Sequence, residues 1–169
     1  MKILVINGPN LNFLGIREPE IYGATRYETL VEMIRARGAE LGLETVFFQS
    51  NHEGALIDRI QSAYSDGTDG ILINPAGFTT TSVAILDALK AVGLPAVEIH
   101  LSNIFEREAF RQDSLIRLAC FATVVGKGIP GYFEGLALLK ERLTEGKAHS
   151  ETLRTSEVEI GRASCRERV

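Results

Sequence analysis

The sequence lacks the long hydrophobic stretches that mark membrane and secreted proteins. No stretch approaches the roughly 20 apolar residues that a helix needs to cross a bilayer. At the start of the chain, Lys2 is followed by only four apolar residues before Asn7, which is too few for the core of a secretory signal. We therefore expect no membrane association and a cytoplasmic location.

Clustered positive charge is also lacking. The 169 residues include 18 Lys and Arg against 22 Asp and Glu, which gives a net charge of −4. A mildly acidic chain without basic clusters offers little attraction to a phosphate backbone. No nucleic-acid partner is expected.

Cysteine and histidine are few and widely spaced. Of the two cysteines, Cys120 lies in an apolar run and is interpreted as a small buried hydrophobe rather than a reactive thiol. The three histidines, His52, His100 and His149, have no zinc-ligand spacing with either cysteine. We expect no disulfide framework and no metal site.

The motifs that bind common cofactors are missing at the first strand. The loop after it has no GxGxxG pattern, and the chain has no Walker A sequence, so a dinucleotide or a nucleotide triphosphate is not expected. A phosphoacceptor domain would place acidic residues there to hold Mg²⁺, but Asn7, Gly8 and Asn10 occupy the positions. These absences narrow the candidate functions to those that need no dinucleotide, nucleotide triphosphate or phosphoacceptor Mg²⁺ site.

What the chain does contain is a regular alternation of strand and helix patterns, as expected for βαβ units and a parallel sheet. Five strands favour a flavodoxin-like three-layer sandwich with a five-stranded parallel sheet. Residues 1–147 are expected to form a single domain. A capping box, Ser50 to Glu53, is expected to open the second helix. The predicted strands cover residues 3–6, 44–49, 70–73, 96–99 and 118–125, and the predicted helices cover residues 24–41, 53–63, 79–92 and 132–143.

The helix predicted over residues 79–92 is apolar on every side, which is typical of a helix buried on more than one face. We therefore predict that it lies in a subunit interface.

Residues 148–169 have no periodic apolar face and are expected to be disordered. The last eleven residues, EIGRASCRERV, resemble the translation of a common sequencing-adapter oligonucleotide. Residues 159–169 are therefore interpreted as an artefact and excluded from the fold prediction.

Polar residues follow three of the predicted strands. They lie in residues 7–22, 74–82 and 98–103. Ligand sites of open parallel sheets form outside the carboxyl ends of the strands, so these three segments are expected to converge on one pocket.

Acid and base chemistry is the function that these segments favour. Tyr22 becomes a general base if a guanidinium stabilises its phenolate, and Arg17 is the nearest candidate, with Arg107 or Arg111 as helpers. His100, which follows Glu98 by two residues at a strand end, is a candidate general acid. The residues alone leave an alternative open, in which this tyrosine and this histidine have only structural roles.

Longer blocks of the sequence resemble those of type II 3-dehydroquinases. The first 145 residues carry the resemblance, in the order of that family. The blocks read NGPNLNFLGIREPEIYG, QSNHEGALID, INPAGFTTTSVAILDAL, VEIHLSNIFEREAFR and GYFEGLALL.

This resemblance implies a lyase that dehydrates 3-dehydroquinate to 3-dehydroshikimate by anti elimination through an enolate, without metal or cofactor, in the shikimate pathway or in quinate breakdown. Tyr22 would remove the C2 proton, and Arg17 would lower its pKa. His100, oriented by Glu98, would protonate the departing C1 hydroxyl. Asn10 would hold a water that stabilises the enolate oxygen.

The resemblance also implies how the substrate is bound and how the chains assemble. Asn74, Leu101 and Ser102 would bind the substrate, and Arg111 would hold a ring hydroxyl. The loop with Arg17 and Tyr22 would close over the substrate as a lid. The family forms dodecamers, as tetramers of trimers, in which Asp87 would reach into a neighbouring site.

Five positions depart from the family pattern. Thr80 replaces a histidine that contacts the substrate, Phe78 replaces a tyrosine, Phe105 stands where histidine is common, and residues 112–113 are Gln-Asp where two histidines are usual. We expect a raised KM or a changed ligand preference. Two alternatives follow: a non-catalytic paralogue that binds a cyclic hydroxy acid, and a lyase that acts on a related hydroxylated cyclic ketone.

Overall fold

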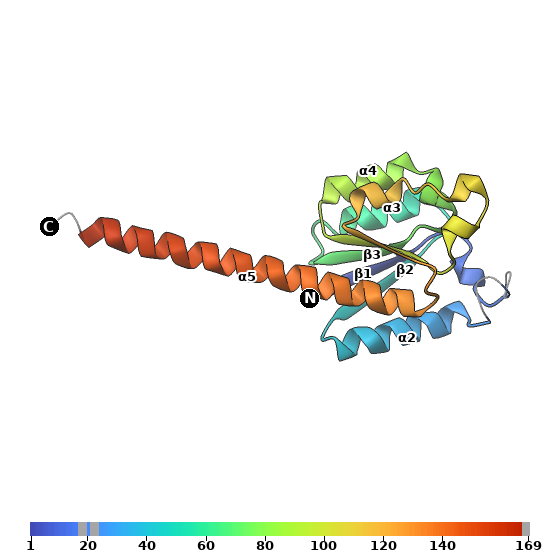
Figure 1. Cartoon of the computed structure of the whole chain (residues 1–169), viewed down its shortest axis with the longest axis horizontal. Helices are drawn as coiled ribbons and strands as arrows, with labels where there is room; N and C mark the ends of the chain where they lie inside the picture. The colour runs from blue at the N-terminus through green and yellow to red at the C-terminus, as the bar shows by residue number, and fades with distance from the viewer. Residues whose placement is uncertain (17–19, 21–23, 167–169) are drawn as a thin grey trace.

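A parallel β-sheet lies between two layers of helices (Figure 1). This computed structural model describes residues 1–16, 20 and 24–166, with side-chain surroundings as far as residue 148. The strands are β1 Lys2–Asn7, β2 Glu44–Gln49, β3 Gly70–Asn74, β4 Ala96–His100 and β5 Ala122–Val125. Their order is β2-β1-β3-β4-β5, and every neighbouring pair is parallel. The predicted flavodoxin-like sandwich is confirmed.

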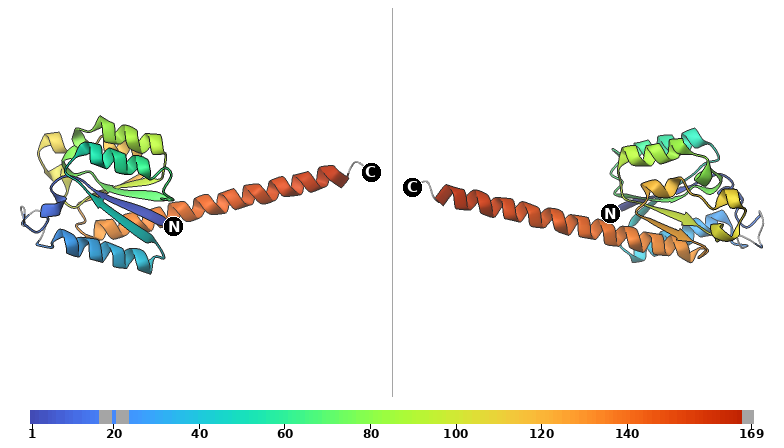
Figure 2. Two further views of the ribbon diagram at one scale, coloured as in Figure 1. Left: turned by 180° about the vertical axis from the view of Figure 1, so that it is seen from behind. Right: turned by 45° about the horizontal axis from the view of Figure 1, so that its top comes forward.

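Two long helices cover each face of the sheet (Figures 1 and 2). On one face lie α2 Tyr27–Glu40 and the start of α5 Pro130–Arg166. On the other face lie α3 Glu53–Ser62 and α4 Val83–Val92. Short 3₁₀ helices occupy the connections, at η1 Leu11–Phe13, η2 Ala76–Thr80, η3 Ile104–Glu106, η4 Ala109–Arg111 and η5 Ile116–Ala119.

The alternation of side chains along each strand builds two hydrophobic cores. In β1, Ile3 and Val5 pack under α2 and α5, whereas Leu4 and Ile6 pack under α3 and α4, and all four side chains are 0% exposed. Because successive strand residues point to opposite faces, a continuous apolar run is what a sheet covered on both sides requires.

Three local predictions differ from the structure. Ser50 forms no capping box: its hydroxyl accepts from the His52 backbone N–H at 3.0 Å, so the Ser50 hydroxyl caps a turn before the helix. The helix predicted from residue 79 begins at Val83, because the Ser82 hydroxyl caps it by accepting from the Ile85 N–H at 2.9 Å. The strand predicted over residues 118–125 begins only at Ala122, since η5 occupies the preceding residues.

The end of the chain also differs from the prediction. Residues 148–166, for which disorder was expected, continue α5 as helix, and this part extends away from the sheet (Figure 1). The segment contains no proline, and its three Glu, three Arg, two Ala and one Leu favour helix. The apolar contacts of α5 with the sheet end near Leu143.

Among the described residues, no helix combines the length and the apolar character that crossing a membrane demands.

Glycine at position 8 is required by a close approach of the β1 and β3 ends. The Gly8 N–H donates to the Asn74 carbonyl at 2.8 Å, and a Cβ added at Gly8 would lie 2.4 Å from the Pro75 carbonyl oxygen. Such a contact is possible only after one backbone segment moves.

We predict that Gly8→Ala lowers the free energy of unfolding by about 1 to 3 kcal/mol, as overpacking typically does. The matched control is Gly54→Ala in α3, where an added Cβ meets nothing within 4 Å. This control should be neutral or stabilising by up to about 1 kcal/mol, because alanine favours helix. Urea denaturation measures both, and equal effects of the two substitutions would contradict the steric argument.

Candidate active site

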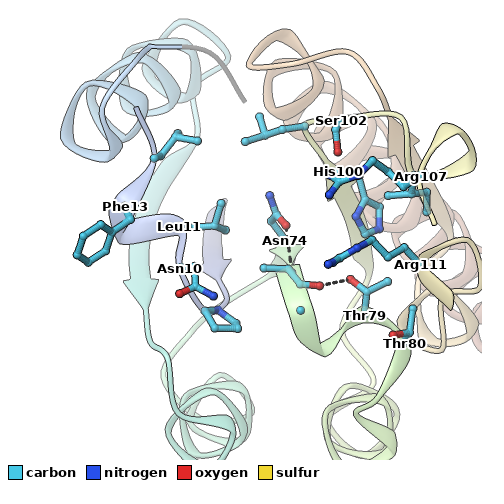
Figure 3. A pocket seen from close by; sticks show the side chains of 16 residues that line it. Asn10, Leu11, Phe13, Asn74, Thr79, Thr80, His100, Ser102, Arg107 and Arg111 are labelled. Atoms are coloured by element: carbon cyan, nitrogen blue, oxygen red, sulfur yellow. Dashed lines mark hydrogen bonds between the residues drawn. The ribbon is translucent and has the colours of Figure 1, made fainter. Parts of the chain in front are cut away.

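A cavity of about 260 Å³ lies at the carboxyl ends of β1, β3 and β4 (Figure 3). The three segments predicted to converge all contribute to it. The lining residues are Pro9, Asn10, Leu11, Phe13 and Leu14 after β1; Asn74, Ala76, Gly77, Thr79 and Thr80 around η2; and His100, Leu101, Ser102, Ile104, Arg107 and Arg111 after β4.

Two arginines make this cavity positive. Arg107 and Arg111 line it, and none of the described lining residues is an Asp or Glu. The exposed carboxylate of Glu108 forms ion pairs with Arg107 at 3.5 Å and with Arg111 at 3.0 Å. A hydrogen bond from its own backbone N–H, and then the charges of Arg111 and Arg107, keep the pKa of Glu108 below its usual value. The site therefore favours an anionic ligand.

The two arginines belong to separate short elements of the chain. Arg107 follows η3, and Arg111 ends η4. Their side chains nevertheless reach the same cavity from these two short helices (Figure 3).

The imidazole ring of His100 is hydrogen-bonded to a buried carboxylate. Its Nε2 lies 2.9 Å from Glu98 Oε1, and Glu98 is 0% exposed. Glu98 also accepts hydrogen bonds from the Ser114 hydroxyl at 2.6 Å and the Thr123 hydroxyl at 3.3 Å. A carboxylate with this set of donors acts as an acceptor, so Nε2 carries the proton that faces it. His100 Nδ1 is left for a ligand.

The backbone around the cavity adopts unusual conformations. Asn10 and Ala76 have φ angles of 68° and 50°, and they are the non-glycine residues with positive φ in the described chain. Both line the cavity. The Asn10 N–H donates to Asn51 Oδ1 at 2.9 Å, which holds the first loop in this shape. Such residues tend to occur at functional sites.

A glycine-rich loop fixes the backbone of the β4 segment. The Gly126 N–H donates to the His100 carbonyl and the Gly128 N–H donates to the Leu101 carbonyl, each at 3.0 Å. These bonds hold Leu101 and Ser102 against the cavity.

The predicted site residues divide into three groups. Asn10, Asn74, Thr80, His100, Leu101, Ser102 and Arg111 line the cavity, and Glu98 lies behind His100. Asp87 is exposed on α4 and is not among the residues that line this chain's cavity. Arg17 and Tyr22 lie outside the described residues.

The other departures from the family pattern lie around the cavity rather than in its lining. Phe78 is partly buried against the core under α3 and α4, and Phe105 is 54% exposed. The Gln112 side chain donates to the Arg107 carbonyl at 2.9 Å, and Asp113 is exposed and 3.7 Å from Arg117.

Sequence reasoning missed the hydroxyls that hold Glu98. Thr123 lies beside Glu98 in the register of β4 with β5, so a known register would have found it. Ser114 lies between η4 and η5, and no sequence signal marks it.

Two further kinds of ionisable group are the possible metal ligands and the thiol of Cys120. In the described part of the chain, no three His, Cys, Asp or Glu side chains are placed to hold a metal ion together. Burial, with a smaller contribution from the Glu98 charge, raises the pKa of the Cys120 thiol to about 12. This thiol therefore stays protonated near neutral pH, and Cys120 is half-buried against the core under α3 and α4 rather than fully buried as predicted.

Comparison with known proteins identifies the family of the chain. The sequence profile of the family described as Dehydroquinase class II matches residues 1–140. The 3-dehydroquinate dehydratase of Caldicellulosiruptor saccharolyticus is 56% identical over 142 residues, which are 84% of this chain and 98% of that protein. That of Clostridium perfringens is 52% identical over 143 residues, which are 85% of this chain and 99% of that protein.

Solved structures give the same result. The type II dehydroquinase of Butyrivibrio crossotus superposes with a TM-score of 0.81 and 53% identity, covering 82% of this chain and 97% of that one. A 3-dehydroquinate dehydratase-like protein of Bifidobacterium longum is more distant, with a TM-score of 0.63 and 29% identity over 85% of this chain and 98% of that one. Sequence and fold agree, and the chain belongs to the class II dehydroquinase family.

Proposed function

We propose that the protein is a 3-dehydroquinate dehydratase that converts 3-dehydroquinate to 3-dehydroshikimate with the side chains of the cavity described above. The observation that carries the proposal is the His100 imidazole, which is bonded to buried Glu98 and lines a cavity with two arginines, to which the described residues contribute no carboxylate. The substrate is a carboxylate that loses water, so it needs both a positive pocket and a proton donor.

Tyr22 is proposed as the base that removes the C2 proton. Bringing the pKa of a phenol from about 10 to between 7 and 8 requires about 3 to 4 kcal/mol of preferential stabilisation of the phenolate, which a partly desolvated Arg17 would supply. Supporting this, their segment follows directly on Leu14, which lines the cavity, and precedes α2. The electron pair of the broken C–H bond passes to the C3 carbonyl oxygen as an enolate, which a water held by Asn10 would stabilise.

His100 is proposed as the acid. Its Nε2–H remains on Glu98, while a proton on Nδ1 passes to the C1 hydroxyl, which leaves as water as the enolate collapses to the conjugated enone. The Glu98 carboxylate offsets the positive charge of the imidazolium before the transfer and keeps the ring oriented. The elimination moves a proton and hydroxide without net redox change, so the proposal includes no redox cofactor.

The remaining lining residues are proposed to bind the substrate. Its carboxylate would lie against the Ser102 hydroxyl, the backbone of Leu101 and Ser102, and Asn74, while Arg111 would hold a ring hydroxyl. Thr80 offers a hydroxyl to the same cavity. Because this side chain is shorter than an imidazole, we propose that it bonds the substrate through water and that KM is raised.

We also propose a homododecamer, built as a tetramer of trimers, in which Asp87 enters a neighbouring chain's site. Its support is α4, which leaves Val83 56% exposed in the single chain and carries Asp87 on its exposed surface, away from this chain's own cavity.

The proposed catalytic domain is residues 1–147. Its support is the extent of the relatives, because 142 aligned residues already make up 98% of the Caldicellulosiruptor saccharolyticus protein. The interpretation of residues 159–169 as an artefact remains a prediction.

The shikimate pathway follows from the family, and a role in quinate breakdown is the alternative. The cytoplasm is the proposed location of this biosynthetic reaction.

The first prediction concerns the base. The protein should convert 3-dehydroquinate, followed by the ultraviolet absorbance of the conjugated enone, and Tyr22→Phe should lower kcat by about 10² to 10⁴-fold because the general base is lost. Tyr64→Phe is the matched control, since Tyr64 is 77% exposed and is not one of the residues that line the cavity.

A Tyr22→Phe variant as active as the parent would contradict the mechanism. Binding of 3-dehydroquinate by the parent without turnover would instead favour the non-catalytic paralogue, and turnover of only a related cyclic ketone would favour the third alternative.

The second prediction concerns the support of Glu98. Ser114→Ala removes the shortest hydrogen bond to this buried carboxylate, at 2.6 Å. Loss of a hydrogen bond to a charged group costs about 1.5 to 3 kcal/mol. We expect a kcat about tenfold lower with KM changed less than about threefold, because Ser114 does not line the cavity. Steady-state kinetics measure kcat and KM separately.

The control for Ser114→Ala is Ser62→Ala, which removes an exposed hydroxyl that donates to the Asp58 carbonyl. It should leave kcat unchanged. A change in KM alone for a folded Ser114→Ala protein would show that Glu98 does not act through His100 in the way proposed.

The third prediction concerns assembly. Light scattering of the purified protein should give a mass near 222 kDa, twelve times the 18.5 kDa of one chain. Val83→Asp, which places a charge on the exposed apolar part of α4, should lower this mass and the activity together. A fully active monomer would rule out the shared site.

A further inference from the structure

The hydroxyl of Tyr132 lies between two asparagines at the sheet edge. Asn7 and Asn74 are the last residues of β1 and β3 and are paired in the register of these strands. The Tyr132 hydroxyl donates to Asn7 Oδ1 at 2.6 Å and accepts from Asn74 Nδ2 at 2.9 Å. Tyr132 comes from α5 and is 0% exposed. One buried hydroxyl thus joins the ends of two strands.

A hydrogen bond from a backbone N–H fixes the orientation of the Asn74 amide. The Ala76 N–H donates to Asn74 Oδ1 at 3.2 Å, and a backbone N–H cannot accept. The amide oxygen of Asn74 therefore faces Ala76, and its NH₂ group faces Tyr132. On the far side, Asn7 Nδ2 lies 3.4 Å from the Tyr27 hydroxyl, to which it donates, so Asn7 presents its oxygen to Tyr132.

These hydrogen bonds determine whether Asn74 presents a donor or an acceptor to a ligand. An asparagine NH₂ group has two N–H bonds, and Tyr132 accepts one of them. Asn74 lines the cavity between Asn10 and His100 (Figure 3). Its second N–H is a donor, which suits the oxygens of an anionic ligand in a cavity that already carries two arginines.

We propose that Tyr132 is a positioning residue for the reaction, whose hydroxyl holds the Asn74 amide with an N–H donor directed at the substrate. Tyr132 itself does not line the cavity, so it acts through Asn74. The inference rests on the proposed function for the identity of the substrate, but the amide orientation rests on the hydrogen bonds alone.

Burial suits the tyrosine to this role. It raises the pKa of the Tyr132 phenol well above its ordinary value, against a smaller opposite effect of the Asn74 hydrogen bond. The hydroxyl therefore stays protonated at working pH and donates to Asn7 while it accepts from Asn74. A phenylalanine at position 132 would fill nearly the same volume but would remove the acceptor of one Asn74 N–H. The amide would then lose the Tyr132 hydrogen bond and keep the one from the Ala76 N–H.

The test is a double-mutant cycle of Tyr132→Phe and Asn74→Ala, measured as kcat/KM for 3-dehydroquinate. Tyr132→Phe should lower kcat/KM about tenfold, mainly through KM, when Asn74 is present. In the Asn74→Ala protein the same substitution should change kcat/KM less than about twofold, because residues that act as a unit are not additive. Tyr64→Phe is the matched control and should have no effect in either protein.

Equal losses with and without Asn74 would overturn the inference, because a purely structural hydroxyl would act in both backgrounds. An unchanged kcat/KM for folded Tyr132→Phe would also overturn it. If Tyr132→Phe does not fold by circular dichroism, Asn7→Ala replaces it in the cycle, since it removes the acceptor of the same hydroxyl and should show the same dependence on Asn74.

A failure of the proposed function has a different signature. If the parent protein does not turn over 3-dehydroquinate, the function is wrong, and the cycle is then measured as the dissociation constant of the same compound by calorimetry. An Asn74-dependent loss of affinity in Tyr132→Phe supports the inference in that case, and an additive loss, or none, overturns it.

Discussion

The parallel pairing of β1 with β3 is the constraint on which the site depends. It lays Asn7 beside Asn74, and just beyond them it brings Gly8 so close to Pro75 that no Cβ fits between. Beyond this contact, the segment after β1 continues into η1 and the segment after β3 continues into η2. The cavity lies between these two segments. β4, the next strand, adds His100 to the same edge. The helices on both faces make this pairing stable, because they allow each strand to be apolar throughout.

A buried negative charge and a set of positive ones give the site its chemical character. Burying a carboxylate such as Glu98 is costly unless donors surround it, and His100, Ser114 and Thr123 supply them. The negative charge lies behind the imidazole, whereas Arg107 and Arg111 face the cavity. This separation lets His100, the proposed proton donor, and an anion-binding surface coexist within one small cavity. Tyr132 acts on Asn74 in a similar way: it does not line the cavity, but its hydroxyl accepts from the Asn74 amide and so fixes the orientation of that amide.

The parts of this structure that sequence could predict are those set by local pattern. The apolar runs at residues 3–6, 70–73 and 96–99 identified buried strands, and the polar residues after them identified the edge that carries the cavity. The apolar run at residues 118–125 predicted too long a strand, because its first part belongs to η5 and the turn after it. Tertiary contacts, which the local pattern does not show, determine this difference. Ser114 and Tyr132 gave no signal, since their partners lie 16 residues away for Ser114, and 58 and 125 residues away for Tyr132. The reaction itself was predictable only from the family resemblance.

The central claim is that one cavity, at the ends of β1, β3 and β4, binds the substrate and directs His100 at its leaving hydroxyl. A crystal structure of the protein with 3-dehydroshikimate, the product, tests this most directly. The account predicts the carboxylate of the product beside Ser102 and Asn74, its C1 within about 4 Å of His100 Nδ1, and Tyr22 over C2 on the opposite face of the ring. Product bound elsewhere, or bound in the cavity with Tyr22 and His100 on the same face of the ring, would contradict it.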